Sequence, residues 1–350
     1  MALKESYGGK DWQSWDESVR MTDETALKSC RRTYGSQIRF HYFLQYLFFK
    51  QWNSLRAYAN RKGIYIVGDI PIYVPLDSAD VWSNPELFLL DGERKPQFVA
   101  GCPPDSFSAD GQRWGNPLYN WDEMKENGYR WWLDRLQAAA KLYDVVRLDH
   151  FRGFESYWSI PAKEETAVNG KWEKGPGMDF ITAVQKALPE LKMIAEDLGY
   201  VTPQVRKLQE DSGYPGMKVL QFAFDSRESG DYLPHTYQKN SVCYCGTHDN
   251  LTLAQWFSEA SSEDVEKAKA YLGLNEEEGF VQGMIRGCMA TVSDLCVIMM
   301  QDYLELDGSA RMNFPGTLST DNWTWRMGSG AATDELARRI YEMTKRYGRI

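Results

Sequence analysis

The sequence predicts an α/β fold, a (β/α)8 TIM-type barrel with long loop insertions. Short apolar runs typical of buried strands alternate with helical stretches, which favours a parallel sheet. Acidic residues recur where these strands end, and a barrel builds its active site from several strand ends at one face. No glycine-rich phosphate loop follows any strand, which disfavours an open doubly wound sheet.

Six stretches are predicted to be strands of this sheet. They begin at residues 64, 144, 193, 218, 242 and 295. Four of them end in an acid: Asp69, Asp149, Glu196 and Asp249. A closed barrel of this type needs eight strands, and the first 60 residues do not obviously supply the other two. We therefore expect a barrel that lacks two strands.

Helical patterns occupy most of the sequence between the predicted strands. After short helix pieces in 1–33, helices are expected near 37–61, 128–142, 178–187, 202–212, 262–272, 277–293 and 333–347. Segments 71–127 and 151–176 are rich in Pro, Gly and Trp, and they are predicted to be loop excursions over the active-site face. Without repeats or a low-complexity linker, residues 1–350 are predicted to form a single catalytic domain.

Composition and charge narrow the class of protein. A chain of 350 residues with 43% hydrophobic content can bury a sizeable core. A net charge of −9 argues against nucleic acid or an anionic membrane as partner. The six cysteines have neither zinc-type spacing nor the density of a disulfide scaffold, so a reducing, cytoplasmic location is expected. Neither a signal peptide nor an apolar stretch of membrane-spanning length is evident.

The aromatic content, 14% with 13 Trp and 20 Tyr, points to a carbohydrate ligand. Many of these aromatic residues could simply belong to the hydrophobic core. Several Trp residues, however, lie in polar, Gly/Pro-rich stretches where a binding surface is more natural, and flat rings stack on the C–H faces of sugars.

Three acids have contexts that suit the cleavage of a glycosidic bond, which needs two carboxyl groups in different protonation states. Arg147 and Asp149 share one strand face, so the guanidinium would keep Asp149 ionised as a nucleophile, although such a pair could equally be structural. Glu196 ends a strongly apolar strand, where desolvation raises a carboxyl pKa and favours a general acid. Asp249, next to His248, could stabilise developing positive charge.

Six sequence blocks resemble signature regions of the amylomaltases, the 4-α-glucanotransferase (disproportionating enzyme) branch of the α-amylase clan. They are Gly68–Pro71, Arg113–Tyr119, Arg147–Gly153, Ala195–Gly199, Gly246–Asn250 and Ala310–Gly316. The resemblance runs in order over nearly the whole chain. It implies that Asp149 is the nucleophile, Glu196 the acid/base and Asp249 the transition-state stabiliser.

The same resemblance implies a set of substrate-binding residues around these acids. Arg147 and His248 would hold the nucleophile and the donor sugar, Asp69 would orient Arg147, and Trp114 and Asn116 would border the junction of donor and acceptor. His150, directly after the nucleophile, completes the predicted set, although it could be a satisfied core histidine.

The reaction implied is transfer of an α-1,4-glucan segment from a maltooligosaccharide donor to an acceptor, with retention and with neither cofactor nor metal. One alternative is a hydrolase of the same clan, but the first acidic strand continues as Asp-Ile-Pro-Ile-Tyr without the histidine expected there. The other alternative is an inactive glucan-binding remnant.

Members of the family carry a further segment before the point matched by Met1, so the chain resembles a truncated member without the first two barrel strands. Open edges at strands 64–70 and 295–299 would then favour a strand-complementing partner or self-association.

Overall fold

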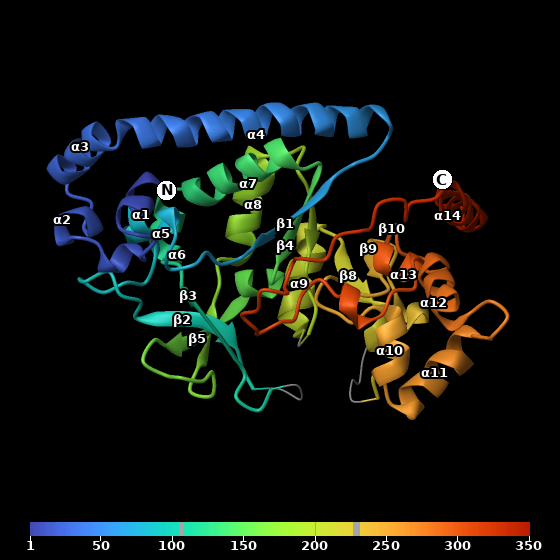
Figure 1. The fold of residues 1–350 in the computed structure, drawn as a ribbon. Helices are drawn as coiled ribbons and strands as arrows, with labels where there is room; N and C mark the ends of the chain where they lie inside the picture. Colours follow the sequence, from blue (N-terminus) through green and yellow to red (C-terminus); the bar gives the residue numbers. More distant parts are fainter. Residues whose placement is uncertain (105–107, 200, 227–231) are drawn as a thin grey trace. The chain divides into compact units, whose positions relative to one another are not determined.

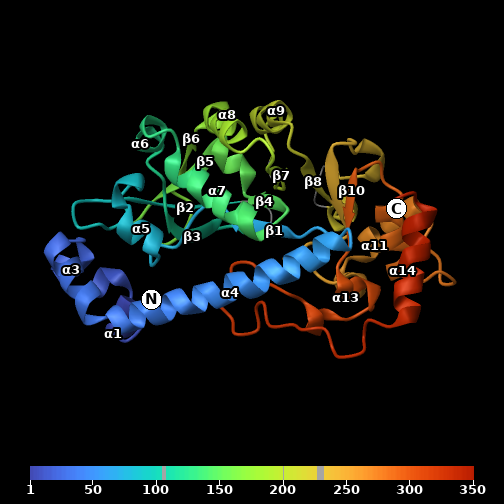
Figure 2. The same ribbon diagram turned by 90° about the horizontal axis from the view of Figure 1, so that it is seen from above.

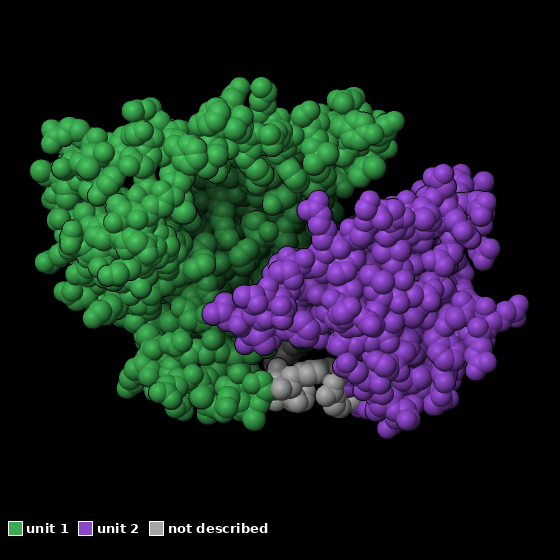
Figure 3. All heavy atoms as spheres, viewed as in Figure 1, with its two compact units in different colours: residues 1–213 green, residues 214–350 purple. Residues whose placement is uncertain are grey.

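The computed structural model describes residues 1–104, 108–199, 201–226 and 232–350, so a small part of the predicted loop 71–127 lies outside the described residues. Helices and strands are interspersed along the chain (Figure 1). Contacts divide the chain into two compact units, residues 1–213 and 214–350, shown in two colours in Figure 3. The assignment of the whole chain to one domain remains a prediction.

The first unit is built on a parallel sheet of three strands. These are β1 (Val67–Pro71), β4 (Val145–Asp149) and β7 (Lys192–Ala195), in the order β1-β4-β7. The register pairs Asp69 with Arg147 and Arg147 with Ile194. Val146 and Leu148 are almost completely buried. The sheet thus places the predicted acids at the carboxyl ends of adjacent strands.

Four longer helices of this unit agree closely with the sequence patterns. They are α4 (Gly35–Arg61), α7 (Arg130–Leu142), α8 (Gly177–Ala187) and α9 (Pro203–Ser212). The Thr202 side chain caps α9 by accepting a hydrogen bond from the Val205 amide. The other helices are α1 (Ala2–Ser6), α2 (Glu17–Arg20), α3 (Glu24–Thr33), α5 (Ala79–Ser83) and α6 (Trp121–Glu126).

Helix α4 is a single long helix (Figure 2) with an unusually apolar exposed surface. None of its residues is buried, and its exposed side chains include Phe40, Tyr42 and Phe43. Trp52 and Arg56 fasten it to the end of α7: the Trp52 indole donates to the Leu142 carbonyl, and Arg56 pairs with Asp144.

The two segments predicted to be loops contain a second sheet, so the prediction of loops throughout is wrong. It is antiparallel, in the order β3-β2-β5-β6, with β2 (Phe98–Cys102), β3 (Gln112–Pro117), β5 (Ser156–Pro161) and β6 (Lys171–Lys174). The first two strands come from one segment and the last two from the other. Each strand is short and interrupted by polar residues, Gly or Pro, so its pattern alone does not predict a strand.

The second unit has a parallel sheet of its own, in the order β10-β9-β8. Its strands are β8 (Gly216–Val219), β9 (Ser241–Tyr244) and β10 (Leu295–Val297). The helices are α10 (Leu253–Glu259), α11 (Ser262–Leu272), α12 (Phe280–Met289), α13 (Met300–Tyr303) and α14 (Asp334–Arg346). Leu220, Cys243 and Met284 belong to the core of this unit.

All six predicted parallel strands are present, which confirms the α/β class. In the part of the chain that the structure describes, they form two sheets of three strands, so a barrel with missing strands is not confirmed. None of the described helices is both long and apolar enough to cross a bilayer.

Candidate active site

One arginine joins two carboxylates at the carboxyl end of the β1-β4-β7 sheet. Arg147 Nη1 donates to Asp69 Oδ2 at 2.6 Å and to Asp149 Oδ1 at 2.8 Å. Burial by itself would lower the pKa of Arg147, but the negative charges of Asp69 and Asp149 outweigh it and raise the pKa. The guanidinium is therefore a fixed positive charge that favours ionised Asp149.

Glu196, one strand further along the sheet, is held by two backbone amides. The amide of His150 donates to Oε2 at 2.7 Å, and the amide of Leu198 donates to Oε1 at 2.8 Å. Removal from water, reinforced by the negative charge of Asp149, raises the pKa of Glu196 to about 7 in spite of these bonds and of Arg147. A carboxyl group with this pKa can donate a proton near neutral pH and accept it back.

His150 takes part through its backbone and its ring. Its φ of 53° is left-handed, a conformation uncommon for a residue with a side chain, and its amide in this conformation donates to Glu196. Desolvation, with the charge of Arg152 adding to it, lowers the pKa of the imidazole to about 3, so the ring is neutral. At Gly153, three residues further on, a Cβ would lie 2.6 Å from Cδ1 of Ile72, so a larger residue there would have to displace that side chain.

The tryptophan predicted at the edge of the site lies against His150. The ring of Trp114, on β3, meets the His150 ring edge-on at a centroid distance of 4.9 Å. Trp114 is 36% exposed, so part of its ring is open to a ligand. Asn116 is half-buried on the same strand. The structure thus brings Asp69, Trp114, Arg147, His150, Asp149 and Glu196 together within the first unit through pairwise contacts.

Asp249 and His248 belong to the second unit, in the turn that follows β9. His248 Nε2 lies 3.4 Å from Asp249 Oδ2. Asn313 donates from Nδ2 to Asp249 Oδ1 at 2.6 Å, and Arg311 donates to the Asp249 backbone carbonyl, also at 2.6 Å. These bonds fix the orientation of the Asp249 carboxylate.

Three residues of this second cluster were missed as individual site residues. Arg311 and Asn313 lie in the block Ala310–Gly316, whose resemblance was noted without assigning roles. Trp323 packs on His248 with ring centroids 4.9 Å apart and is 58% exposed. Its only sequence signal was its place among the Trp residues of polar stretches. Arg311 and Asn313 thus hold Asp249 by two hydrogen bonds, and Trp323 places an exposed ring against His248.

Among the described residues, no group of three or more His, Cys, Asp or Glu residues is arranged to hold a metal ion. The chemistry that these side chains can perform themselves is acid–base and nucleophilic catalysis by carboxyl groups.

Comparisons with known proteins point to one family. The sequence pattern of the 4-alpha-glucanotransferase family matches residues 1–331. The chain is 46% identical over its whole length to a 4-alpha-glucanotransferase of Clostridium butyricum, of which it covers 72%. It is 44% identical to a 4-alpha-glucanotransferase of Thermus thermophilus and covers 71% of that protein.

Solved structures agree with these sequence matches. An amylomaltase from Streptococcus agalactiae in complex with acarbose superposes with a TM-score of 0.96 at 41% identity, covering 99% of this chain and 70% of that one. An amylomaltase from Corynebacterium glutamicum, 18% identical, shares the fold with a TM-score of 0.74 over 98% of this chain and 53% of that one.

Proposed function

This chain belongs to the 4-alpha-glucanotransferase family, and on that premise we propose that it transfers α-1,4-glucan segments between maltooligosaccharides. The reaction is a retaining double displacement with Asp149 as nucleophile and Glu196 as acid/base. The observation that carries this assignment is the contrast between the two carboxyl groups. Arg147 contacts Asp149 and favours its charge, whereas desolvation raises the pKa of Glu196 to about 7.

In the first step, protonated Glu196 gives its proton to the glycosidic oxygen while Asp149 attacks the anomeric carbon. The bond to the leaving sugar breaks, and the donor segment becomes covalently attached to Asp149. In the second step, ionised Glu196 takes the proton of the acceptor's 4-hydroxyl group. That oxygen then displaces Asp149, and the two inversions leave the α configuration unchanged.

Asp249 is proposed to stabilise the positive charge that develops on the sugar ring. Its carboxylate, oriented by Asn313, is a preformed negative group of the required kind. This role requires the two three-stranded sheets to be parts of one (β/α) barrel that presents all three acids at one face. Support comes from the strand order: in both sheets, strands that follow one another among the parallel strands are neighbours.

Transfer rather than hydrolysis requires that water be kept from the covalent intermediate until the acceptor arrives. We assign this role to the antiparallel sheet built from segments 71–127 and 151–176. Trp114 on its strand β3 touches His150 and leaves part of its ring exposed for a sugar of the acceptor. A cytoplasmic location, where maltooligosaccharides would be the partners, fits six cysteines none of which forms a disulfide.

Product analysis with maltotriose tests the proposal. Transfer yields glucose together with oligosaccharides longer than maltotriose, whereas hydrolysis yields only shorter products. Binding of maltotriose without turnover would instead indicate a glucan-binding protein and would overturn the proposed activity.

The roles of the two carboxyl groups can be tested separately. Asp149→Asn should lower turnover by about 10⁴-fold or more, while Asp134→Asn, an exposed carboxylate on α7, should leave it unchanged. Glu196→Gln treated with a maltosyl fluoride, whose leaving group needs no proton donor, should accumulate a glycosyl adduct. Peptide mapping should place the adduct on Asp149, and an adduct on another residue would refute the assignment.

An experimental structure of the chain with a bound maltooligosaccharide tests the barrel. Carboxyl groups of Asp249 and Glu196 around the same sugar are expected. A sugar that contacts Glu196 with Asp249 far from it would refute both the closed barrel and the role of Asp249.

A further inference from the structure

The second unit contains a cluster of free thiols that the proposed reaction does not use. Cys288 Sγ, on α12, lies 3.0 Å from Cys243 Sγ and 3.3 Å from Cys296 Sγ. Cys243 on β9 and Cys296 on β10 are register partners in the parallel sheet, and α12 carries Cys288 over both. Sulfur atoms this close need only small side-chain rotations to reach bonding distance, which is about 2 Å.

Burial distinguishes the members of this cluster. Cys243 and Cys288 are completely buried, whereas Cys296 is half-buried. Cys296 also lines a pocket of about 590 Å³ that lies entirely within the second unit. A small reagent in this pocket would therefore meet Cys296 before the other two thiols.

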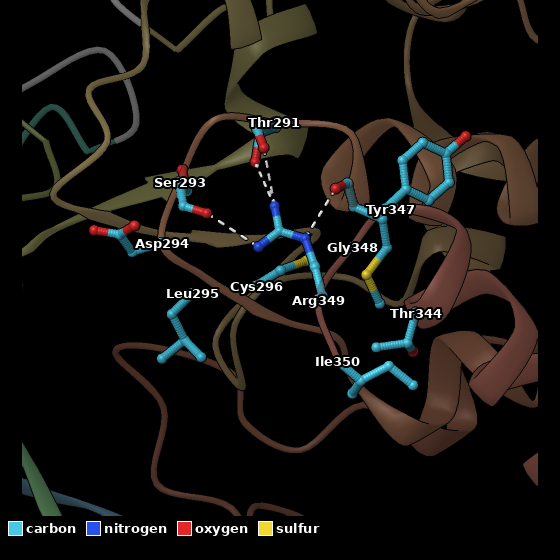
Figure 4. Close-up of a pocket in the computed structure, with 11 residues that line it drawn as sticks. Thr291, Ser293, Asp294, Leu295, Cys296, Thr344, Tyr347, Gly348, Arg349 and Ile350 are labelled. Atoms are coloured by element: carbon cyan, nitrogen blue, oxygen red, sulfur yellow. Dashed lines mark hydrogen bonds between the residues drawn. The ribbon is translucent and has the colours of Figure 1, made fainter.

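Arg349 is the basic residue of the pocket lining, which also contains Asp294. Its guanidinium donates to the backbone carbonyls of Met289, Thr291 and Ser293, which fixes the segment between α12 and β10 (Figure 4). Figure 4 also shows Cys296 beside this guanidinium. A cation next to a thiol stabilises the thiolate, which is the reactive form.

The two thiols differ in their readiness to ionise. The hydrogen bond with Cys288, and then the charge of Arg349, lower the pKa of Cys296 although burial opposes them. Burial, together with the neighbouring thiols, raises the pKa of Cys288 well above its usual value. Cys296 is therefore the thiol that attacks first, and Cys288 is positioned to react with the product.

We propose that Cys296 and Cys288 form a redox modification site, in which a peroxide that enters the pocket oxidises Cys296 and Cys288 then closes a disulfide. The Cys296 thiolate attacks one peroxide oxygen, the O–O bond breaks, and the departing hydroxide takes up a proton to become water. Cys288 then attacks the sulfenic sulfur, and its thiol proton leaves with the sulfenic oxygen in a second molecule of water. Two thiols are oxidised and one peroxide is reduced.

The disulfide would join α12 to β10 in the core of the second unit. It closes a loop of only a few residues, since Cys288 and Cys296 are eight positions apart. The two sulfur atoms are already in contact, 3.3 Å apart.

The test treats the folded, full chain with an equimolar amount of hydrogen peroxide, then blocks the remaining thiols with N-ethylmaleimide and analyses peptides by mass spectrometry. The expected result is the loss of two free thiols and a Cys288–Cys296 cross-link that dithiothreitol reverses. Cys30, a half-buried thiol of the first unit, serves as the internal control and should remain free.

Two variants distinguish the role of Cys296 from that of Cys288. In Cys288→Ala, the sulfenic acid on Cys296 should persist and be trapped by dimedone. In Cys296→Ser, neither the sulfenic acid nor the cross-link should form. The unmodified chain tests the proposal even if a variant fails to fold. Oxidation of Cys30 before Cys296, a cross-link between Cys243 and Cys288, or over-oxidation of Cys296 with Cys288 still free would each overturn it.

Discussion

Replacing Arg147 by methionine should move the whole pH profile of the enzyme upward. Arg147 is the cation between Asp69 and Asp149. Its Nη1 lies 2.6 Å from Asp69 Oδ2 and 2.8 Å from Asp149 Oδ1. An opposite charge at such distances lowers a carboxyl pKa by about 1–3 units. Asp149 must be ionised to attack, so activity is lost as pH falls through its pKa. Without Arg147, that acidic limb should move to higher pH.

The basic limb of the pH profile should also move to higher pH. Glu196 must be protonated to cleave the donor, so activity is lost as pH rises through its pKa of about 7. Arg147 is one of the groups that hold this value down, and its removal raises it further. We expect kcat/KM at the optimum to fall by about 10²–10³-fold, the range typical for loss of one preorganised electrostatic contact.

The fold should tolerate the substitution better than the chemistry does. The side chains of Asp69 and Asp149 are 40% and 41% exposed, so water screens their mutual repulsion. We expect the unfolding free energy to fall by only about 1 kcal/mol.

The assay is kcat/KM for maltotriose disproportionation across the pH range, fitted to two apparent pKa values for the coupled groups. Arg147→Lys, which keeps the charge, should shift the limbs less than the methionine variant. Arg130→Met, which breaks an exposed pair on α7, should shift neither limb. A lower rate with both limbs unmoved would show that Arg147 does not set these pKa values.

Three further predictions concern other residues. Asn313→Ala removes the hydrogen bond to Asp249 and should lower kcat by about tenfold with little change in Tm; an unchanged kcat would remove Asn313 from the site. Trp114→Ala should raise the ratio of hydrolysis to transfer, measured as glucose released against longer oligosaccharides formed, because water gains access; an unaltered ratio would contradict its proposed place. Asp302 is completely buried, and desolvation raises its pKa to about 7, so the folded chain binds its proton more tightly than the unfolded one. The unfolding free energy should therefore decrease between about pH 4 and pH 7, by at most about 1.4 kcal/mol per pH unit from this group, and urea titrations of Asp302→Asn should lack that contribution.

The parallel strands could be predicted because burial on both faces leaves a simple apolar pattern. Val145-Val146 and Met193-Ile194-Ala195 are examples, and both lie in observed strands. The antiparallel sheet could not be predicted, because its strands are stabilised by pairing between two distant segments. The Trp158–Trp172 ring contact, for instance, joins β5 to β6 only after both have formed.

In the candidate site too, some features could be predicted from the sequence and others could not. The Arg147–Asp149 pair follows from strand periodicity alone, since alternate residues share a face. The hydrogen bond from the His150 amide to Glu196 depends on a left-handed backbone at His150 and on a partner 46 residues away. The sequence pattern predicts neither. The hydrogen bond from Asn313 to Asp249 joins residues 64 positions apart, so the sequence pattern does not predict it either. The roles of the three acids themselves stay predictions until the variants are measured.

The division of the chain into two units has a consequence for inactivation. Asp149 and Glu196 are supported by the core of one unit, and Asp249 by the core of the other. If all three serve one sugar, heat or denaturant could abolish turnover while circular dichroism still reports nearly full secondary structure. Loss of activity would then precede the unfolding transition of either core, and a single melting temperature would overstate how long the enzyme works. Catalysis itself would be the most sensitive probe of how well the two halves cooperate.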